Sequence, residues 1–232
     1  TGWTMSHQTR PFKIHCQCMP MKIKQVLRRF GFDVVRYHSF WDEIAQPRRF
    51  RTILDIGANE GSSARPLRRR FPDAAIYSFE PLHDCYQALV AAMRDDGKFR
   101  AFNLALGEKA GTAIIHRSAS HASSSLLPMG TLHKKIYPKT AEHTEETIEV
   151  ARLDEIMRNV PIEKPLFVKI DVQGFEASVI KGGTHTLAQA DMILIENSFT
   201  TLYEGQALFG DIHDLLRDLG FSYRGRSETH YN

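Results

Sequence analysis

Glycines and an acidic residue occur in an order that suits nucleoside binding. Gly57 and Gly61 follow the apolar run 53–56, and Glu80 ends the next apolar run, 75–79. Glycine lets the backbone approach a ligand closely, and a helix beginning near Gly61 would offer unpaired N–H groups. Glu80 is placed to accept hydrogen bonds from both hydroxyls of a ribose. The alternative is that the glycines only make a tight strand-to-helix turn.

Asn59 and Asp55 indicate which nucleoside cofactor the turn favours. A dinucleotide-binding turn has the pattern G-x-G-x-x-G, whose middle glycine makes room for pyrophosphate, but Asn59 stands at that position here. An acidic, amide-bearing loop suits a ligand that carries a cationic amino-acid group. The turn therefore favours S-adenosylmethionine, and a nicotinamide-dependent oxidoreductase is the alternative.

The elements that must position these residues alternate between strands and helices. Apolar runs at 53–56, 75–79 and 99–103 are separated by helical patterns that end near residue 70 and cover about 83–95. This alternation is typical of a parallel sheet covered on both faces, which binds ligands beyond the carboxyl ends of its strands. We expect an α/β, Rossmann-like fold with a mostly parallel, doubly wound sheet.

The second half of the chain is less regular. Further strands and helices are expected over 112–116, 147–151, 166–171, 176–182, 192–196 and 208–219. The polar stretch 118–143 is expected to be a long loop, and such loops are usually functional or disordered. A last strand is expected to begin at 221–223.

The N-terminal residues differ from the rest in charge. Residues 1–54 carry ten Lys and Arg against three acids, a local charge of +7 in a chain of net charge +3. We predict a basic extension over 1–50, irregular at first and helical near 21–31, and a cofactor-binding domain over 51–232. The extension could attract an anionic partner or surface, and a solvated helix face is the alternative.

Composition argues against several classes of protein. With 232 residues, 42% hydrophobic and 25% charged, and with three cysteines, the chain resembles an ordinary globular protein without a disulfide framework or zinc site. It has no apolar run of 18 residues and no signal-peptide core near its start. The interleaved aromatics of a nucleic-acid platform are also missing. We expect a cytoplasmic protein that binds no nucleic acid.

Ordered blocks of residues resemble the FkbM-type S-adenosylmethionine-dependent methyltransferases. They are Asp55–Gly61, Tyr77–Pro81, Asn103–Gly107, Ser123–Leu126, Arg152–Glu155 and Val168–Glu176, with Leu187 and Ile195-Glu196 after them. The resemblance spans about residues 20–224. It implies the class I methyltransferase fold with a seven-stranded, mostly parallel sheet, and O-methylation of hydroxyls on sugars, polyketides and related natural products. Little chain follows the last helix, so we expect the C-terminal strand pair of that fold to be incomplete.

The resemblance also implies where S-adenosylmethionine binds. The methionine end would contact Asp55, Gly57, Asn59 and Gly61. The ribose would contact Glu80, with Pro81 and Leu82 beside it. The adenine would contact Asn103, Leu104 and Ala105. The acceptor would be a small-molecule or glycan hydroxyl, and a homodimer is considered.

Asp171 is the first candidate for catalysis. Methyl transfer needs an acceptor oxygen held in line, and a weakly nucleophilic hydroxyl gains from a general base. Asp171 ends the strand expected over 166–171. Lys169 can share its side of that strand, and we expect it on the acceptor side, paired with an acid of the site. Glu196 is expected on the acceptor side or as a second carboxylate behind Asp171, and Glu176 as an acid at a helix N-terminus.

Three further residues are weaker candidates. His185 is the second residue to test for catalysis, although loop histidines are more often solvated surface residues. Ser124 and Ser125 are assigned to an acceptor-binding loop, with flexible, Ser-rich chain as the alternative.

A metal-assisted reaction is a further alternative. Asp171, Glu196 and Asn197 resemble the carboxylate, carboxylate and amide set of catechol-type methyltransferases, which could hold Mg²⁺. The middle ligand would be Glu rather than Asp, so our main prediction includes no metal.

Overall fold

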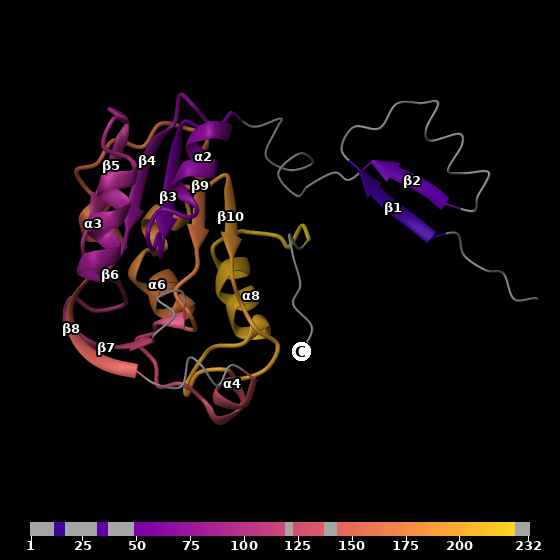
Figure 1. Cartoon of the computed structure of the whole chain (residues 1–232). Helices are drawn as coiled ribbons and strands as arrows, with labels where there is room; N and C mark the ends of the chain where they lie inside the picture. Colours follow the sequence, from indigo (N-terminus) through magenta and orange to yellow (C-terminus); the bar gives the residue numbers. More distant parts are fainter. Residues whose placement is uncertain (1–11, 17–31, 37–48, 119–122, 137–142, 226–232) are drawn as a thin grey trace, which may run out of the picture. The chain divides into compact units, whose positions relative to one another are not determined.

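The computed structural model describes residues 12–16, 32–36, 49–118, 123–136 and 143–225. The chain divides into two compact units, with the change from the first to the second between Arg48 and Arg49, and each is described by itself. In the first unit β1 (Phe12–Cys16) and β2 (Phe32–Arg36) form a parallel two-stranded sheet (Figure 1). The expectation of irregular chain was therefore wrong for β1. The helix expected near 21–31 lies outside the described residues.

The second unit is built on one parallel sheet. Its strands are β3 (Thr52–Ile56), β4 (Ala75–Phe79), β5 (Phe99–Phe102), β9 (Leu166–Ile170) and β10 (Met192–Ile195). They lie in the order β10-β9-β3-β4-β5, and every neighbouring pair is parallel. All five residues of β3 are buried because β3 lies in the middle of the sheet with both faces covered. In this sheet β3 comes first in the sequence, β4 and β5 follow on one side of it, and β9 and β10 are added later on the other side.

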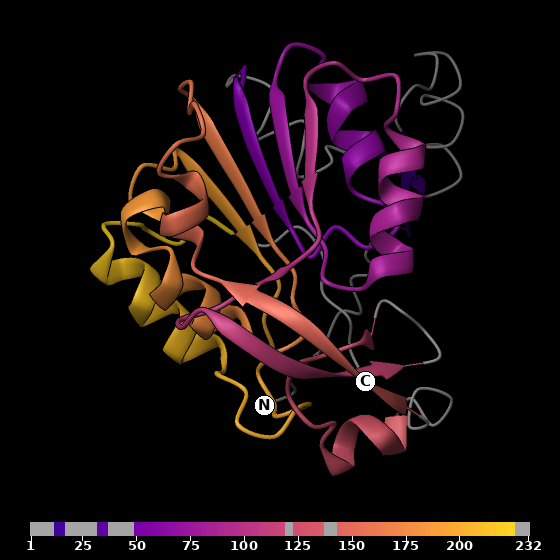
Figure 2. The same cartoon turned by 90° about the vertical axis from the view of Figure 1, so that its left-hand side faces the viewer.

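Helices cover both faces of this sheet, as a doubly wound fold requires. Figure 2 shows α2 (Ala64–Arg70) and α3 (His83–Ala92), in purple and magenta, on one face, and α6 (Glu176–Gly182) and α8 (Phe209–Asp218), in orange and yellow, on the other. Apolar side chains fill both layers. Leu89 of α3 packs with Ala64 of α2, and Val179 and Ile212 join the core under β3, β4 and β9. The predicted α/β, Rossmann-like, doubly wound fold is confirmed.

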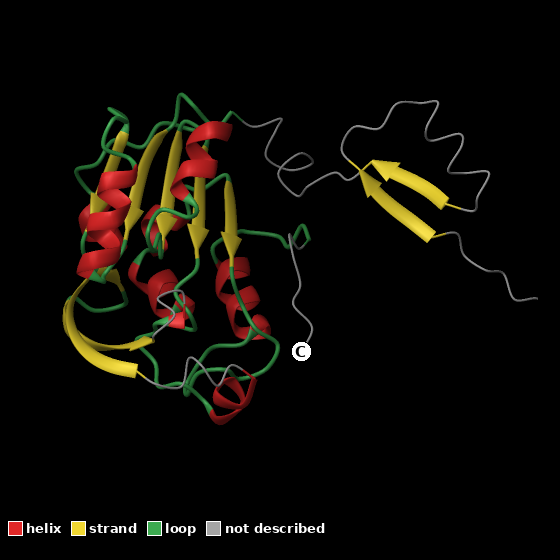
Figure 3. Cartoon of the chain, viewed as in Figure 1, coloured by secondary structure: helices red, strands yellow, loops and turns green. Residues whose placement is uncertain are grey.

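A second sheet and three short helices complete this unit (Figure 3). The sheet has the order β6-β8-β7, in which β7 and β8 are antiparallel. Its strands are β6 (Ala105–Leu106), β7 (Gly111–Ser118) and β8 (His143–Ala151). The short helices are α4 (Thr131–Ile136), α5 (Leu153–Met157) and α7 (Thr184–Leu187).

The second unit also differs from the sequence-based expectations. Within 118–143, α4 and a bridge between His116 and Ser125 give order to part of the expected loop. Residues 221–225 form no strand, so the last expected strand was wrong. The main parallel sheet has five strands among the described residues, whereas the resemblance implied seven. β10 is therefore an edge strand in this part of the chain.

The helices of the described residues bear on whether this part of the chain could cross a membrane. Among them, no helix combines the length and the apolar character that a membrane span requires.

Candidate functional site

Four acidic residues lie at or just beyond the carboxyl ends of four strands of the main sheet. Asp55 lies within β3, Glu80 follows β4, Asp171 follows β9 and Glu196 follows β10. Sheet order reverses between β3 and β9, the position where open α/β sheets bind ligands. The sequence predicted this convergence, and the structure provides it. We call this group of residues the strand-end site.

The turn after β3 passes very close to the chain after β9. A Cβ atom on Gly57 would lie 1.8 Å from the carbonyl oxygen of Asp171, and the φ angle of Gly57 is +79°. Only glycine satisfies both conditions. Gly61, at φ +90°, packs on the Leu89 side chain, which a Cβ would approach to 3.2 Å. Both glycines are thus required by the backbone of the site.

Asn59 presents a polar atom that has no hydrogen-bond partner among the residues that the structure describes. Its φ angle of +49° is one that asparagine tolerates better than most residues. Its side-chain oxygen is buried and accepts no hydrogen bond. A buried acceptor without a donor is costly, so this oxygen marks a position where a ligand N–H or O–H group would fit.

Glu80 is fixed by the backbone. One carboxylate oxygen accepts the N–H of Asn59 at 2.9 Å and the other accepts the N–H of Leu82 at 2.9 Å. The side chain is only 6% exposed, and this burial raises the pKa of Glu80 to about 7, partly offset by the two N–H groups. Each oxygen keeps a further lone pair for a ligand hydroxyl.

Asp55 lies underneath the site rather than on its surface. It is fully buried, and both of its oxygens accept the hydroxyl of Ser63, at 2.9 and 2.7 Å. Burial raises the pKa of Asp55, and the nearby Lys169 ammonium opposes that rise. The prediction that Asp55 lines the cofactor is therefore not supported, since a fully buried side chain can touch no ligand in this arrangement. Asp55 instead helps to hold the Ser63 hydroxyl and the Lys169 ammonium in place.

Lys169 links the two sides of the site. Its ammonium lies 3.2 Å from a carboxylate oxygen of Asp171 and 3.6 Å from one of Asp55. Burial lowers the pKa of Lys169, but attraction to these two acids outweighs burial and leaves it raised. The shorter contact is to Asp171, whereas the fully buried Asp55 contributes the larger attraction to the ammonium, so Lys169 is shared by both acids. The pairing of Lys169 with a site acid was predicted.

Asp171 and Glu196 are joined by one amide. The side-chain nitrogen of Gln173 donates to Asp171 at 3.0 Å and to Glu196 at 2.7 Å. Burial tends to raise the pKa of Asp171, but the Lys169 ammonium and hydrogen bonds bring it below its ordinary value. Glu196 is open to solvent on one side and surrounded by protein on the other. This partial burial, with a contribution from Asp171, raises the pKa of Glu196 to about 8.

These opposite shifts assign different states to the two carboxyl groups. The pKa of Asp171 is lowered and that of Glu196 is raised, so a proton bound by the pair lies on Glu196 and leaves Asp171 able to accept one. Glu176, by contrast, begins α6 and accepts the backbone N–H groups of Val172 and Gly174 at 3.1 and 3.2 Å. Glu176 therefore shapes the turn after β9.

The two serines are held in structural hydrogen bonds. The Ser125 hydroxyl donates to the carbonyl of Gln173 at 2.6 Å and accepts the N–H of Leu127 at 3.0 Å. The Ser124 hydroxyl accepts the N–H of Ser118 at 3.1 Å. Ser125 is only 2% exposed, so the prediction that it contacts the acceptor is not supported. It tethers its loop to the strand-end site instead.

The residues predicted near the adenine also support the backbone. The Asn103 side-chain amide donates to the carbonyls of Glu80 and Pro81, both at 2.9 Å, which fixes the chain after β4. Leu104 and Ala105 are buried. Contact of Pro81, Asn103, Leu104 and Ala105 with a cofactor stays a prediction.

The metal alternative gains no support from the geometry. The Lys169 ammonium already neutralises Asp171. In the part of the chain that the structure describes, no group of three or more His, Cys, Asp or Glu side chains is arranged to hold a metal ion.

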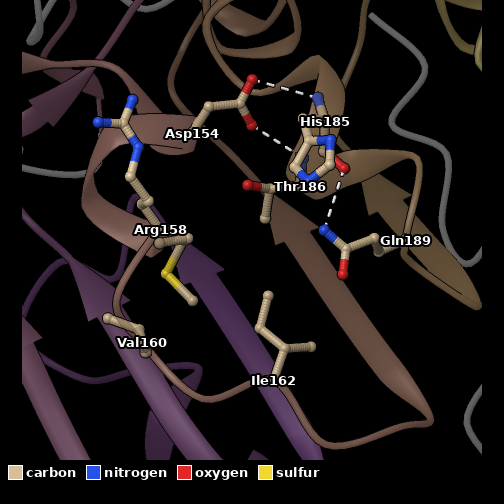
Figure 4. Close-up of a pocket in the computed structure, with 8 residues that line it drawn as sticks. Asp154, Arg158, Val160, Ile162, His185, Thr186 and Gln189 are labelled. Carbon is tan, nitrogen blue, oxygen red and sulfur yellow. Dashed lines mark hydrogen bonds between the residues drawn. The ribbon is translucent and has the colours of Figure 1, made fainter.

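His185 lies elsewhere, in a pocket of about 520 Å³ between α5 and α7 (Figure 4). Asp154 accepts the backbone N–H groups of His185 and Thr186 there, at 3.1 and 2.8 Å. The lining residues come from segments that directly precede β9 and β10, so the pocket lies toward the amino ends of these strands. Asp171 lies beyond the carboxyl end, so the structure does not bring His185 to it. The catalytic assignment of His185 is not supported.

Sequence reasoning missed two residues of the site. Gln173 lies inside the block Val168–Glu176, and its place between two predicted acids was the available signal. Tyr203 donates its hydroxyl to the side-chain oxygen of Gln173 at 3.0 Å. No local pattern marks Tyr203, because it lies 30 residues from Gln173 in a segment without regular structure.

Comparison with known proteins identifies related chains. The family model described as the methyltransferase FkbM domain matches residues 55–223. The chain is 31% identical over 170 residues to the 2-O-methyltransferase NoeI of Sinorhizobium fredii, with 71% of this chain and 70% of that protein covered. It is 26% identical over 176 residues to the hexuronic acid methyltransferase AglP of Haloferax volcanii, covering 73% and 68%.

Two further proteins are similar to this chain. The methyltransferase sdnD of Sordaria araneosa is 27% identical over 200 residues, with 76% of each chain covered. Among solved structures, the methyltransferase FkbM of Methylobacillus flagellatus aligns with 17% identity and a TM-score of 0.42. That alignment covers 63% of this chain and 32% of the crystallised one, so the chain spans about a third of its length.

Proposed function

The chain belongs to the family of FkbM methyltransferases, and we propose that it is an S-adenosylmethionine-dependent O-methyltransferase whose catalytic domain comprises residues 51–232. The acceptor is a hydroxyl of a sugar, glycan or polyketide-like natural product. The names of two relatives, a 2-O-methyltransferase and a hexuronic acid methyltransferase, support this acceptor class. Because the family is one of methyltransferases, the alternative of a nicotinamide-dependent oxidoreductase is wrong.

The observation that carries the cofactor assignment is the pair formed by Asn59 and Glu80. Within the described ranges no group donates to the buried Asn59 oxygen, and the Glu80 carboxylate is fixed beside it by the N–H of Asn59. A ligand with ribose hydroxyls and an amino group supplies the donors that these oxygens lack. Gly57 and Gly61 let the turn that carries Asn59 pack closely against Asp171 and Leu89. The residues present thus fit S-adenosylmethionine.

The chemistry divides between the cofactor and the protein. S-adenosylmethionine, when bound, supplies a methyl group on a positively charged sulfur. The protein holds the acceptor hydroxyl and takes its proton on Asp171, which Lys169 keeps ionised at 3.2 Å. Glu196, whose pKa is raised, holds a proton bound by the pair, which leaves Asp171 free to accept the proton of the acceptor hydroxyl.

Titration calorimetry of the full chain with S-adenosylmethionine tests the cofactor. We expect micromolar-range binding, weakened about 100-fold in Glu80→Ala, because loss of two charge-assisted hydrogen bonds costs about 3 kcal/mol. Glu163→Ala is the matched control, since Glu163 is an exposed acid paired with Arg51. Absence of binding by the unaltered protein, or unchanged binding by Glu80→Ala, would contradict the assignment.

A transfer assay with methyl-labelled S-adenosylmethionine tests the acceptor class. Sugars, glycans and polyketide-like alcohols are offered in parallel with amines and thiols. Labelled product from hydroxyl acceptors alone supports O-methylation. Transfer to an amine or thiol in preference to every hydroxyl would refute it.

A further inference from the structure

Gln173 occupies a constrained position in the turn after β9. Its φ angle is +53°, in a backbone region that residues other than glycine seldom adopt, and Gly174 follows with a φ angle of +99°. The carbonyl of Gln173 accepts the Ser125 hydroxyl at 2.6 Å. Such backbone conformations persist where surrounding contacts require them and are common at functional sites.

The Gln173 side chain uses every hydrogen-bonding group it has. Its nitrogen donates one hydrogen to Asp171 and one to Glu196, and its oxygen faces the Tyr203 hydroxyl at 3.0 Å. Asp171, whose pKa is lowered, is ionised and accepts hydrogen bonds only, so the nitrogen must face Asp171 and the oxygen accepts the Tyr203 hydroxyl. The orientation of the amide follows from its partners.

Tyr203 can hold that orientation because it is itself fixed. It is 2% exposed, and a Cβ on Gly174 would lie 3.1 Å from its ring, so the ring packs directly on the backbone of the turn. The backbone N–H of Tyr203 binds the Gln206 side chain at 3.2 Å, and Met129 bridges to Tyr203 from the other side. Burial raises the pKa of the Tyr203 phenol, so it stays a donor at neutral pH.

We propose that Tyr203 and Gln173 are positioning residues of the strand-end site: Tyr203 fixes the Gln173 amide, and that amide holds Asp171 and Glu196 side by side. The role of this pair in catalysis rests on the proposed methyl transfer. With both amide hydrogens engaged, Asp171 keeps one orientation toward the acceptor and Glu196 stays close enough to influence its charge.

The proposal predicts that the titration of the carboxyl pair depends on Tyr203. Other charged and titratable groups facing the pair are Asp55 on β3, Lys169 on β9 and Glu176 on α6. The ring of His133 on α4 lies 5.0 Å from the Tyr203 ring. Tyr203→Phe leaves all of these groups in place and removes only the hydroxyl.

The test is NMR titration of the side-chain carboxyl groups in the full chain labelled with ¹³C at Asp and Glu, with Asp171→Asn and Glu196→Gln used for assignment. In Gln173→Met the pair loses two donors to its charged form, so its titration midpoint should rise by about one pH unit. In Tyr203→Phe the amide is free to turn, and we expect a smaller rise in the same direction. Tyr223→Phe, at a tyrosine that is 59% exposed, is the matched control and should leave the midpoint unchanged.

A second measurement connects the pair to catalysis. In Tyr203→Phe, kcat should fall about tenfold while the Kd for S-adenosylmethionine stays unchanged, because the altered group lies on the acceptor side. Unchanged midpoints in both Gln173→Met and Tyr203→Phe would overturn the positioning role. If the midpoints rise as expected but the unaltered protein methylates no acceptor, the positioning role stands and the proposed function fails.

Discussion

At the end of β4, two backbone N–H groups hold Glu80, whereas beyond β9 the side chains of Lys169 and Gln173 hold Asp171. We call these the backbone-held half and the side-chain-held half of the strand-end site. Backbone donors are placed by the sheet and its turns, so the backbone-held half has one geometry. The side-chain-held half depends on rotamers, and its charges balance one another.

This difference matches the tasks proposed for the two halves. A cofactor common to a family needs a fixed site, which backbone groups provide irrespective of most side-chain changes. An acceptor site that abstracts a proton needs a base with a defined charge, and neighbouring side chains set that charge. The contact between Gly57 and Asp171 is where the halves meet.

Gly57→Ala should have the largest effect on the strand-end site, because the new side chain would force its two halves apart. The new Cβ would meet the Asp171 carbonyl oxygen at 1.8 Å in a positive-φ conformation, so we expect a loss of about 4 kcal/mol or more in the free energy of unfolding, measured in urea. Gly205→Ala is the control: its φ is +77° but nothing lies within 4 Å, so it should cost only about 1 kcal/mol. Equal losses in the two variants would show that the contact is unimportant.

Asp171→Asn separates the tasks of the two halves. Turnover should fall about 100-fold, equivalent to about 3 kcal/mol, while the Kd for S-adenosylmethionine stays within about twofold. Labelled methyl transfer and calorimetry measure the two quantities. Asp95→Asn is the control, since Asp95 is an exposed acid whose partner is Arg94. Near-normal turnover in Asp171→Asn would remove Asp171 as the base.

Glu80→Gln tests how burial of the Glu80 carboxyl group in the backbone-held half affects the free energy of unfolding. The pKa of Glu80 is raised from 4.5 to about 7 in the folded protein, so folding favours its protonated form. Its stabilising effect is complete well below pH 4.5 and is lost as pH rises through about 7, by roughly 3 kcal/mol. Unfolding at pH 4.5 and pH 8 should show this fall in the unaltered protein and a smaller one in Glu80→Gln. The same dependence in both proteins would contradict the assignment.

Removal of metal should have the smallest effect. Because Lys169 already neutralises Asp171, EDTA should leave methyl transfer unchanged. Loss of activity in EDTA that Mg²⁺ restores would reinstate the metal alternative at Asp171, Glu196 and Asn197.

The sequence alone determined the sheet, the glycine turn and the acids at the strand ends. These are local features of the sequence. Because the strands are parallel, Glu80 and Asp171 then lie at the same end of the sheet, beyond the carboxyl ends of its strands. His185 shows the limit of this reasoning. His185 was chosen by residue type, but α7 directly precedes β10 and so lies toward the amino ends of the strands, away from Asp171.

Only the tertiary structure decided which side chains touch. Tyr203 and Ser125 reach Gln173 from 30 and 48 positions away in the chain, and Asp55 is covered by Ser63 rather than exposed to a ligand. Burial and hydrogen bonds between distant segments depend on how loops fold over the sheet. A linear pattern gives the order of the acids, but their charges depend on these contacts, because the pKa of each carboxyl follows from what surrounds it.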